Sequence, residues 1–273
     1  MECIVRDTPV YYETYGNGIP LLSLHGYFVD HHLMTGCMEP LFVQRTGWQR
    51  IYLDLPGMGK TPGTEQINSS EDVLELVLDF IDAVIPNQPF ALAGESYGGL
   101  ISRGVLQRRF QQLVGMALIC PVITADYQQR DLPPHTTIVE DPQLLASLSP
   151  TNAAEFGPMV VVQDTYNWER FRDEILTGVH IANYAFLDKL QKQGGFSFNV
   201  DQLEQPFPRP VILFTGRQDS IVGYRDAWNV LENYSRGTFA VLDRAGHNAQ
   251  IEQSQLFTAL MGEWLDRVEE AMR

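Results

Sequence analysis

The chain has 273 residues, of which 44% are hydrophobic and 19% charged, which is the composition of a folded protein with a sizeable core and not of a disordered one. Its net charge of −15, from 19 basic and 34 acidic residues, argues against nucleic acid and anionic membrane surfaces as partners, because both would repel it. The three cysteines are too few and too scattered for a disulfide framework.

The N-terminal residues, MECIVRDTPVYYETYG, contain no basic leader followed by an apolar run. No window of the sequence approaches the roughly 18 uninterrupted apolar residues of a membrane span. We therefore expect a cytoplasmic protein that does not associate with membranes. Residues 3–6 and 10–15 alternate between polar and apolar side chains around a short link at 7–9. This alternation predicts an antiparallel hairpin at the start of the fold.

Six short apolar runs follow, each of strand length and bounded by turn residues. They comprise residues 20–24, 50–53, 90–93, 113–119, 211–215 and 238–242. Unbroken apolar runs of this length are typical of strands buried on both faces of a parallel sheet. Segments with helical spacing lie between them, most clearly at 69–86, where Ser69 and Asp72 predict a capped start. Strands alternating with helices predict an α/β fold with a mostly parallel central sheet flanked by helices.

The alternation stops between about residues 121 and 209, where many prolines punctuate a helical or irregular stretch. We expect this stretch to be a helical cap, inserted after the strand at 113–119, and residues 1–120 and 210–273 to form one core domain. Seven large apolar side chains are candidates for the underside of the cap, with a small core of the cap itself as the alternative. They are Tyr166, Trp168, Phe171, Ile181, Tyr184, Phe186 and Leu187.

The loop DLPGMGKT, at residues 54–61, ends like a phosphate-binding P-loop. However, Asp54 stands where the first glycine of that motif belongs and would bring a negative charge towards the phosphates. Pro56 also removes one of the backbone N–H groups that such a cradle uses. We therefore expect no nucleotide at this loop.

The segment FALAGESYGGL, at residues 90–100, is a predicted strand that runs through G-x-S-x-G into a helix. In this context Ser96 lies on a tight, strained turn, and Gly94 and Gly98 are needed because larger side chains would collide across it. The turn exposes the serine oxygen beside a helix N-terminus, whose positive end favours developing negative charge. Ser96 is therefore the predicted nucleophile.

A serine hydroxyl needs a base to remove its proton and a carboxylate to orient that base. His247 follows the run at 238–242 and Asp219 follows the run at 211–215, so both are expected at the same edge of a parallel sheet as Ser96. Asp126, shortly after the run at 113–119, is the rival acid. Because the base is a histidine, we expect kcat/KM to rise with pH through an apparent pKa near ~6.5, moved by the surroundings of the ring.

Taken together, nearly the whole chain resembles the α/β-hydrolase superfamily. The matching pieces are His25-Gly26, the D-x-P-G-x-G loop at 54–59, the Ser96 elbow, Gly216-x-x-Asp219 and Gly246-His247. The resemblance implies the α/β-hydrolase fold, with Ser96, His247 and Asp219 as a catalytic triad. It also implies an oxyanion hole formed by the backbone N–H groups of Tyr27 and Tyr97.

The same resemblance implies a structural role for His25 and for the 54–59 loop, and it implies neither a metal nor an organic cofactor. The other four histidines show no metal-binding spacing and are expected to be solvated or packed. They are His31, His32, His135 and His180.

Within the superfamily, the segment GHNAQIE at 246–252 is similar to the G-H-W-x-Q-x-E of carbon–carbon bond hydrolases that cleave 2-hydroxy-6-oxo-dienoates. Asn248 in place of the tryptophan and Glu95 in place of a small or amide residue depart from that pattern. These substrates carry a carboxylate and an enol oxygen, which would need a cation or hydrogen-bond donors. The candidate cations of the cap are Arg130, Arg170, Arg172, Lys189 and Lys192. Proline iminopeptidases fit less well, because HGYF and ESYG replace their HGGPG and GSWG.

The apolar cap favours a small to medium apolar carboxylic ester as the small-molecule substrate, hydrolysed through an acyl-enzyme. A carbon–carbon bond hydrolase is the second hypothesis. A non-catalytic or slow-turnover receptor for a small ligand, on the same fold, is the third. The substrate, the cap residues that line the pocket and the oligomeric state stay open.

Overall fold

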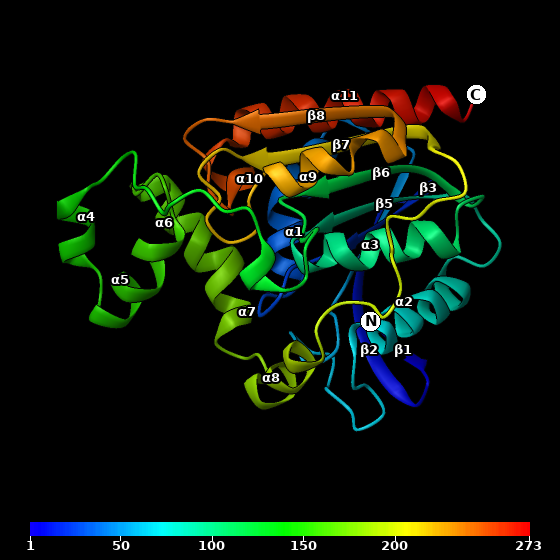
Figure 1. The fold of residues 1–273 in the computed structure, drawn as a ribbon, viewed down its shortest axis with the longest axis horizontal. Coiled ribbons are helices and arrows are strands. Elements are labelled where there is room, and N and C mark those ends of the chain that lie inside the picture. Colours follow the sequence, from blue (N-terminus) through cyan, green and yellow to red (C-terminus); the bar gives the residue numbers. More distant parts are fainter.

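The computed structural model describes all residues from 1 to 273, and an eight-stranded sheet runs through its middle in the order β1-β2-β4-β3-β5-β6-β7-β8 (Figure 1). Neighbouring strands from β4 to β8 in this order are parallel, whereas β2 pairs antiparallel with β1 and β4. The mostly parallel sheet with an antiparallel start is thus confirmed. The strands are β1 (Glu2–Val5), β2 (Thr8–Tyr15), β3 (Ile19–Leu24), β4 (Trp48–Leu53), β5 (Phe90–Glu95), β6 (Leu113–Ile119), β7 (Phe207–Gly216) and β8 (Tyr234–Leu242).

β7 and β8 each begin four residues before the predicted start, at Phe207 and Tyr234. β7 has two prolines in this extension, at 208 and 210, which concealed the strand in the sequence. β6 pairs with β7 only from Val211 onwards, so the extension has β8 as its sole neighbour. Proline lacks a backbone N–H, and it is tolerated where a strand is paired on one side.

Helices cover both faces of the sheet, which explains the unbroken apolar strands. α3 (Tyr97–Arg108) packs on β3, β5 and β6, and α2 (Ser70–Val84) packs beside α3 and on β1. α1 (His31–Met38) packs on β3 and β4, while α11 (Ser254–Ala271) packs on β6 and β7. Every residue of β5 and β6 is buried between these layers. The predicted cap of α2 is present, with Ser69 and Asp72 bonded reciprocally.

The segment between β6 and β7 contributes no strand to the sheet and is built from short helices. In Figure 1, α4 and α5 lie far out from the sheet, and α8 lies below the other helices of the segment. The helices are η2 (Tyr127–Gln129), α4 (Pro142–Ser147), α5 (Pro150–Phe156), η3 (Gly157–Met159), α6 (Thr165–Phe171), the π-helical turn η4 (Arg172–Leu176), α7 (Thr177–Val179) and α8 (Tyr184–Gln193).

The remaining helices are short and belong to connections. They are η1 (Glu39–Phe42), α9 (Arg225–Asn229), η5 (Leu231–Asn233) and α10 (Ala249–Glu252). None of the helices has the length and apolar character that crossing a membrane requires.

Candidate active site

Ser96 lies between the end of β5 and the first residue of α3, at a backbone φ of 52° and ψ of −113°. A residue other than glycine rarely adopts this conformation, so the turn is strained. A Cβ atom at Gly94 would collide with the carbonyl oxygen of Gly98 across the turn. A Cβ atom at Gly98 would collide with the carbonyl oxygen of Leu24 in β3. The two glycines therefore allow the turn that presents the serine oxygen.

The structure brings Ser96, His247 and Asp219 together from the ends of three strands. His247 Nε2 lies 2.9 Å from Ser96 Oγ, and His247 Nδ1 lies 3.0 Å from Asp219 Oδ2. Asp219 is fully buried, and its other oxygen accepts hydrogen bonds from the backbone N–H groups of Ile221 and Val222, at 2.9 and 3.0 Å. One carboxylate oxygen is thus fixed by the backbone, which leaves the second for the imidazole.

Asp126, the rival acid, makes no contact with His247. Its carboxylate is exposed and accepts hydrogen bonds from the backbone N–H of Gln128 at 3.0 Å and from Gln129 Nε2 at 2.9 Å. It caps the short helix η2. The geometry therefore associates Asp219, and not Asp126, with the histidine.

Glu95, directly before Ser96, is a second acid at the site. Its side chain is buried, and its Oε1 lies 3.5 Å from His247 Nε2. Burial raises the pKa of Glu95 to about 7, with a further contribution from the charge of Asp219. The sequence marked Glu95 only as a departure from a family pattern. The signal that would have revealed it is an ionisable residue at the end of a strand that is otherwise entirely apolar.

The two carboxylates act on the pKa of His247 in the same direction. Burial of the ring lowers this pKa, but the charge and hydrogen bond of Asp219, together with the charge of Glu95, raise it to about 9. An imidazole with this pKa is mostly protonated at neutral pH. The ring is available as a base mainly under alkaline conditions.

The backbone N–H groups of Tyr27 and Tyr97 have no acceptor within the protein. Tyr97 is the first residue of α3, so its N–H is one of those that a helix leaves unpaired. The two tyrosine rings are in edge-to-face contact, with centroids 5.0 Å apart, and the Tyr27 hydroxyl donates to the carbonyl of Leu187 at 2.6 Å. These contacts fix the loop that carries Tyr27 against the first residue of α3, which follows Ser96.

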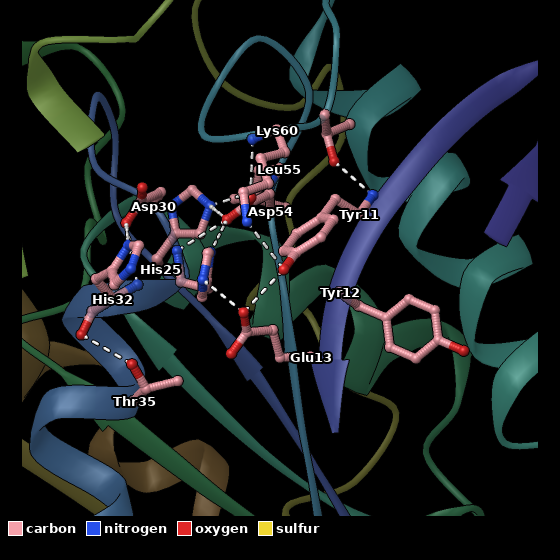
Figure 2. Close-up of polar contacts among 12 residues, drawn as sticks. Tyr11, Tyr12, Glu13, His25, Asp30, His32, Thr35, Asp54, Leu55 and Lys60 are labelled. Atoms are coloured by element: carbon pink, nitrogen blue, oxygen red, sulfur yellow. Dashed lines mark hydrogen bonds and ion pairs between the residues drawn. The ribbon is translucent and has the colours of Figure 1, made fainter. Parts of the chain in front are cut away.

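His25 and Asp54 tie two loops together beside the site, as the polar network in Figure 2 shows. His25 is fully buried, and its Nε2 accepts the backbone N–H of Leu55 at 2.9 Å. The Asp54 carboxylate accepts the backbone N–H groups of His31 at 2.8 Å and Lys60 at 2.9 Å. The Lys60 N–H, which a P-loop would offer to a phosphate, is thus engaged by Asp54. The network gives His25 and the 54–59 loop structural contacts.

The remaining histidines lie apart from Ser96. The ligand atoms of Asp30, His31 and His32 lie within 4.8 Å of one another, which raises the question of a metal. However, His31 Nδ1 lies 2.8 Å from Asp54 and its Nε2 lies 3.3 Å from Glu13, so both ring nitrogens face carboxylates of the protein. His31 therefore offers no free nitrogen to a metal. His135 is exposed, and His180 lies 3.3 Å from Glu155 on the surface.

Two cavities of about 380 Å³ each share Ser96 and His247 in their walls. We call the first the Glu95 lobe, because Glu95 lines it together with Phe171, Ile175 and Leu176. We call the second the Arg130 lobe, because it extends past Arg130 and the apolar side chains of Leu100, Val122, Leu190 and Ile221. Eleven of the 17 residues that line each lobe are hydrophobic. An ester bond at Ser96 can therefore have one substituent in each lobe.

Only two of the seven side chains expected beneath the cap line these cavities: Phe171 and Tyr184, both in the Glu95 lobe. The other five line neither cavity; Phe186 packs on the core, and the contact of Trp168 with Phe156 lies within the segment itself, which is the alternative interpretation. Tyr166 and Ile181 are exposed, Trp168 packs edge-on against Phe156, Phe186 packs against the glycines at 57 and 63, and Leu187 is buried in the core.

Of the five candidate cations of the cap, only Arg130 reaches either cavity. Arg170 is paired with Glu174, and Arg172 is paired with Asp173 on the surface. The two lysines, Lys189 and Lys192, are exposed.

The residues that suggested a carbon–carbon bond hydrolase have other contacts. Glu252 accepts the backbone N–H groups of Val161, Val162 and Gly246, and so ties the segment after β6 to the loop that carries His247. Gln250 is buried beside a different, smaller cavity near Cys37. Neither side chain lines the Glu95 lobe or the Arg130 lobe.

A family model described as serine aminopeptidase, S33 (Hydrolase_4) matches residues 22–254. The chain belongs to this family of α/β hydrolases. The family is one of enzymes, and curated relatives of the chain are named esterases.

Among curated relatives of this α/β hydrolase, a pimeloyl-[acyl-carrier protein] methyl ester esterase of Legionella pneumophila (strain Corby) is 24% identical over 259 residues, which cover 94% of this chain and 99% of the relative. Among solved structures, an alpha/beta superfamily hydrolase from Oenococcus oeni PSU-1 is 30% identical, with a TM-score of 0.90 and coverage of 98% of this chain and 99% of the other. A meta-cleavage product hydrolase from Pseudomonas fluorescens IP01 is 18% identical, with a TM-score of 0.70 and coverage of 97% of each chain, and shares the fold.

Proposed function

We propose that this protein is a serine hydrolase that cleaves small to medium apolar carboxylic esters through an acyl-enzyme. The observation that carries the proposal is the continuous chain from Ser96 Oγ through His247 to Asp219, with contacts of 2.9 and 3.0 Å. These are the distances at which a base can accept the proton of a serine hydroxyl and a carboxylate can orient that base. No other serine of the chain has a hydrogen bond to a histidine.

In the first step, Ser96 Oγ attacks the ester carbonyl carbon while its proton passes to His247 Nε2. The carbonyl oxygen becomes negatively charged, and the free N–H groups of Tyr27 and Tyr97 are the donors that we propose for it. The imidazolium then gives its proton to the departing alkoxide, which leaves as an alcohol. Water, deprotonated by the same nitrogen, attacks the acyl-enzyme and releases the acid.

The apolar lining of both lobes supports an ester with apolar substituents, because such cavities bind ligands mainly by excluding water from carbon surface. The relatives whose names include an esterase point in the same direction. We further propose that residues 121–209 form a cap over a core of residues 1–120 and 210–273. Phe171 and Ile175, which line the Glu95 lobe, come from this segment.

The test is ester turnover by the wild type and by Ser96→Ala, with p-nitrophenyl butyrate as substrate. We expect kcat to fall by about 10⁴ to 10⁶ in the variant, with little change in Tm. Ser102→Ala is a matched control, because Ser102 is a buried serine of α3 that contacts neither His247 nor a lobe. Retained turnover in Ser96→Ala would exclude this mechanism.

The receptor hypothesis is separated from the enzyme by turnover and not by labelling. A fluorophosphonate should label Ser96 in either case, because both would hold an activated serine. We expect labelling and multiple turnovers of the ester on the same preparation. Labelling with a single burst of product and no further turnover would favour a receptor.

A further inference from the structure

The two lobes that meet at Ser96 differ in charge. The Glu95 lobe has two carboxyl groups in its wall, from Glu95 and Glu155, and no lysine or arginine. The Arg130 lobe has the guanidinium of Arg130 in its wall and no aspartate or glutamate. The walls that the two lobes do not share thus contain carboxyl groups in one lobe and a guanidinium in the other, while His247 lines both.

Arg130 is held rigidly by backbone carbonyl groups. Its Nε donates to Thr124 at 2.8 Å, its Nη1 donates to Ile221 at 2.8 Å, and its Nη2 donates to Ala125 at 3.1 Å. A guanidinium has five N–H groups, so two remain for another acceptor. The fixed orientation lowers the entropy that such an acceptor would cost on binding.

No carboxylate of the protein forms an ion pair with Arg130. The three backbone carbonyls, the charge of Asp219 and the ring of Tyr127, 5.5 Å from the guanidinium carbon, compensate its charge only in part. The guanidinium is partly buried, and burial lowers its pKa, although arginine keeps its proton in proteins. A partly buried cation without a counter-ion is costly, and an anion bound in the lobe would offset that cost.

We propose that the Arg130 lobe is an anion subsite, in which Arg130 binds a carboxylate on one end of the ester substrate. The other, neutral and apolar, end then lies in the Glu95 lobe, where a second carboxylate would meet Glu95 and Glu155. The substrate class is a carboxylic ester with a free carboxylate on either its acyl or its alcohol part. This inference rests on the proposed ester hydrolysis at Ser96.

Arg130 also has a structural role that the experiment must separate from binding. It holds the carbonyl of Ile221, whose N–H is bonded to Asp219, so a disturbed loop would weaken catalysis on every ester. Loss of binding, by contrast, affects only esters with a carboxylate. The ratio of kcat/KM between a charged ester and a matched neutral ester isolates the second effect.

The matched acyl pair is mono-p-nitrophenyl glutarate and p-nitrophenyl valerate, which differ by a carboxylate in place of a methyl group. The matched alcohol pair is 4-carboxyphenyl acetate and 4-methylphenyl acetate. For one of the two pairs, we expect the wild type to prefer the charged ester, and Arg130→Met to lower the preference about tenfold to a hundredfold. Arg130→Lys should keep part of the preference, and the control Arg172→Met, which changes an exposed cation of the same segment, should keep all of it.

An equal loss of kcat/KM on charged and neutral esters in Arg130→Met would show that Arg130 only fixes the loop that contains Ile221. That result would overturn the proposal. A wild type that prefers the neutral member of both pairs would overturn it as well. Turnover of the neutral esters tests the proposed function separately, because that reaction does not need the anion subsite.

Binding can be measured without turnover in the Ser96→Ala variant. Monomethyl glutarate should raise Tm more than methyl valerate does, and the difference should disappear in Ser96→Ala/Arg130→Met. It should also shrink with added salt, because an ion pair at a partly open site is screened. An equal effect of the two esters on Tm would contradict the anion subsite even if the protein hydrolysed no ester.

Discussion

Glu95 Oε1 lies 3.5 Å from His247 Nε2, and the same nitrogen lies 2.9 Å from Ser96 Oγ. The atom that must accept the serine proton therefore has a buried carboxyl group as its second neighbour. When Glu95 is ionised, its charge stabilises the protonated imidazole and opposes the free base. The residue before the nucleophile thus affects the pH range in which the nucleophile can be activated.

We expect kcat/KM for p-nitrophenyl butyrate to rise with pH through an apparent pKa of about 9. The pKa of His247 is raised to this value by Asp219 and Glu95, and only the unprotonated ring accepts the serine proton. This is more alkaline than the value expected for an ordinary histidine. Rates from pH 5 to 10, corrected for spontaneous hydrolysis, measure it. An acid limb centred near pH 6.5 would contradict the effect of the carboxylates.

Glu95→Gln should move this acid limb to lower pH, by roughly one pH unit. The amide keeps the size of the side chain but removes the negative charge that raises the pKa of His247, so the ring becomes a free base at lower pH. At pH 7 the variant should therefore be faster than the wild type. Glu155→Gln is the control, because Glu155 lines the same lobe without contacting His247. Equal shifts in both variants would point to a general effect of charge.

The same substitution should change the pH dependence of stability. Burial raises the pKa of Glu95 from 4.5 to about 7, so between these values the folded protein binds more protons than the unfolded chain. The contribution of Glu95 to the free energy of unfolding is then largest at low pH and decreases as the pH rises to 7. Glutamine does not ionise, so it makes no pH-dependent contribution to the free energy of unfolding. The free energy of unfolding of Glu95→Gln, relative to wild type, should increase between pH 5 and 8 by up to about 3 kcal/mol. Urea unfolding at the two pH values tests it, and a constant difference would refute it.

The strands and the serine turn could be predicted from the sequence because their causes are local. Runs buried on both faces have to be apolar, and the Ser96 turn leaves no room for a Cβ atom at Gly94 or Gly98. The early start of β7 could not be predicted, because it depends on pairing with the start of β8, which lies elsewhere in the chain. The contact of Glu95 with His247 and that of Arg130 with Ile221 also join residues that are distant in the chain, so the sequence could not reveal them.

Asp219 contacts His247 and Asp126 does not, so we expect substitutions of these two acids to have different effects on kcat. Asp219→Asn should lower kcat by about 10⁴, because the amide favours the wrong tautomer of His247. Asp126→Asn should leave kcat unchanged, because Asp126 caps η2 and does not contact the ring. Both variants keep the size of the side chain, and Tm shows whether each is folded. A large loss in Asp126→Asn, with activity retained in Asp219→Asn, would reverse the assignment.

We expect p-nitrophenyl butyrate to be cleaved faster than a 2-hydroxy-6-oxo-dienoate. The carbon–carbon reaction rests on Gln250 and Glu252, and neither side chain lines a lobe: Glu252 is engaged by backbone N–H groups, and Gln250 is buried beside a different cavity. Arg130 could hold the carboxylate of the dienoate, but that contact binds the substrate without assisting cleavage of a carbon–carbon bond.

Both reactions should be measured on one preparation, with Ser96→Ala as the blank for each. Faster cleavage of the dienoate would reverse the ranking of the two functions. In that case Arg130→Met should raise KM for the dienoate, because Arg130 is the only lysine or arginine of the segment that lines a cavity together with Ser96. Ester turnover without dienoate cleavage is the result that the positions of Gln250 and Glu252 predict.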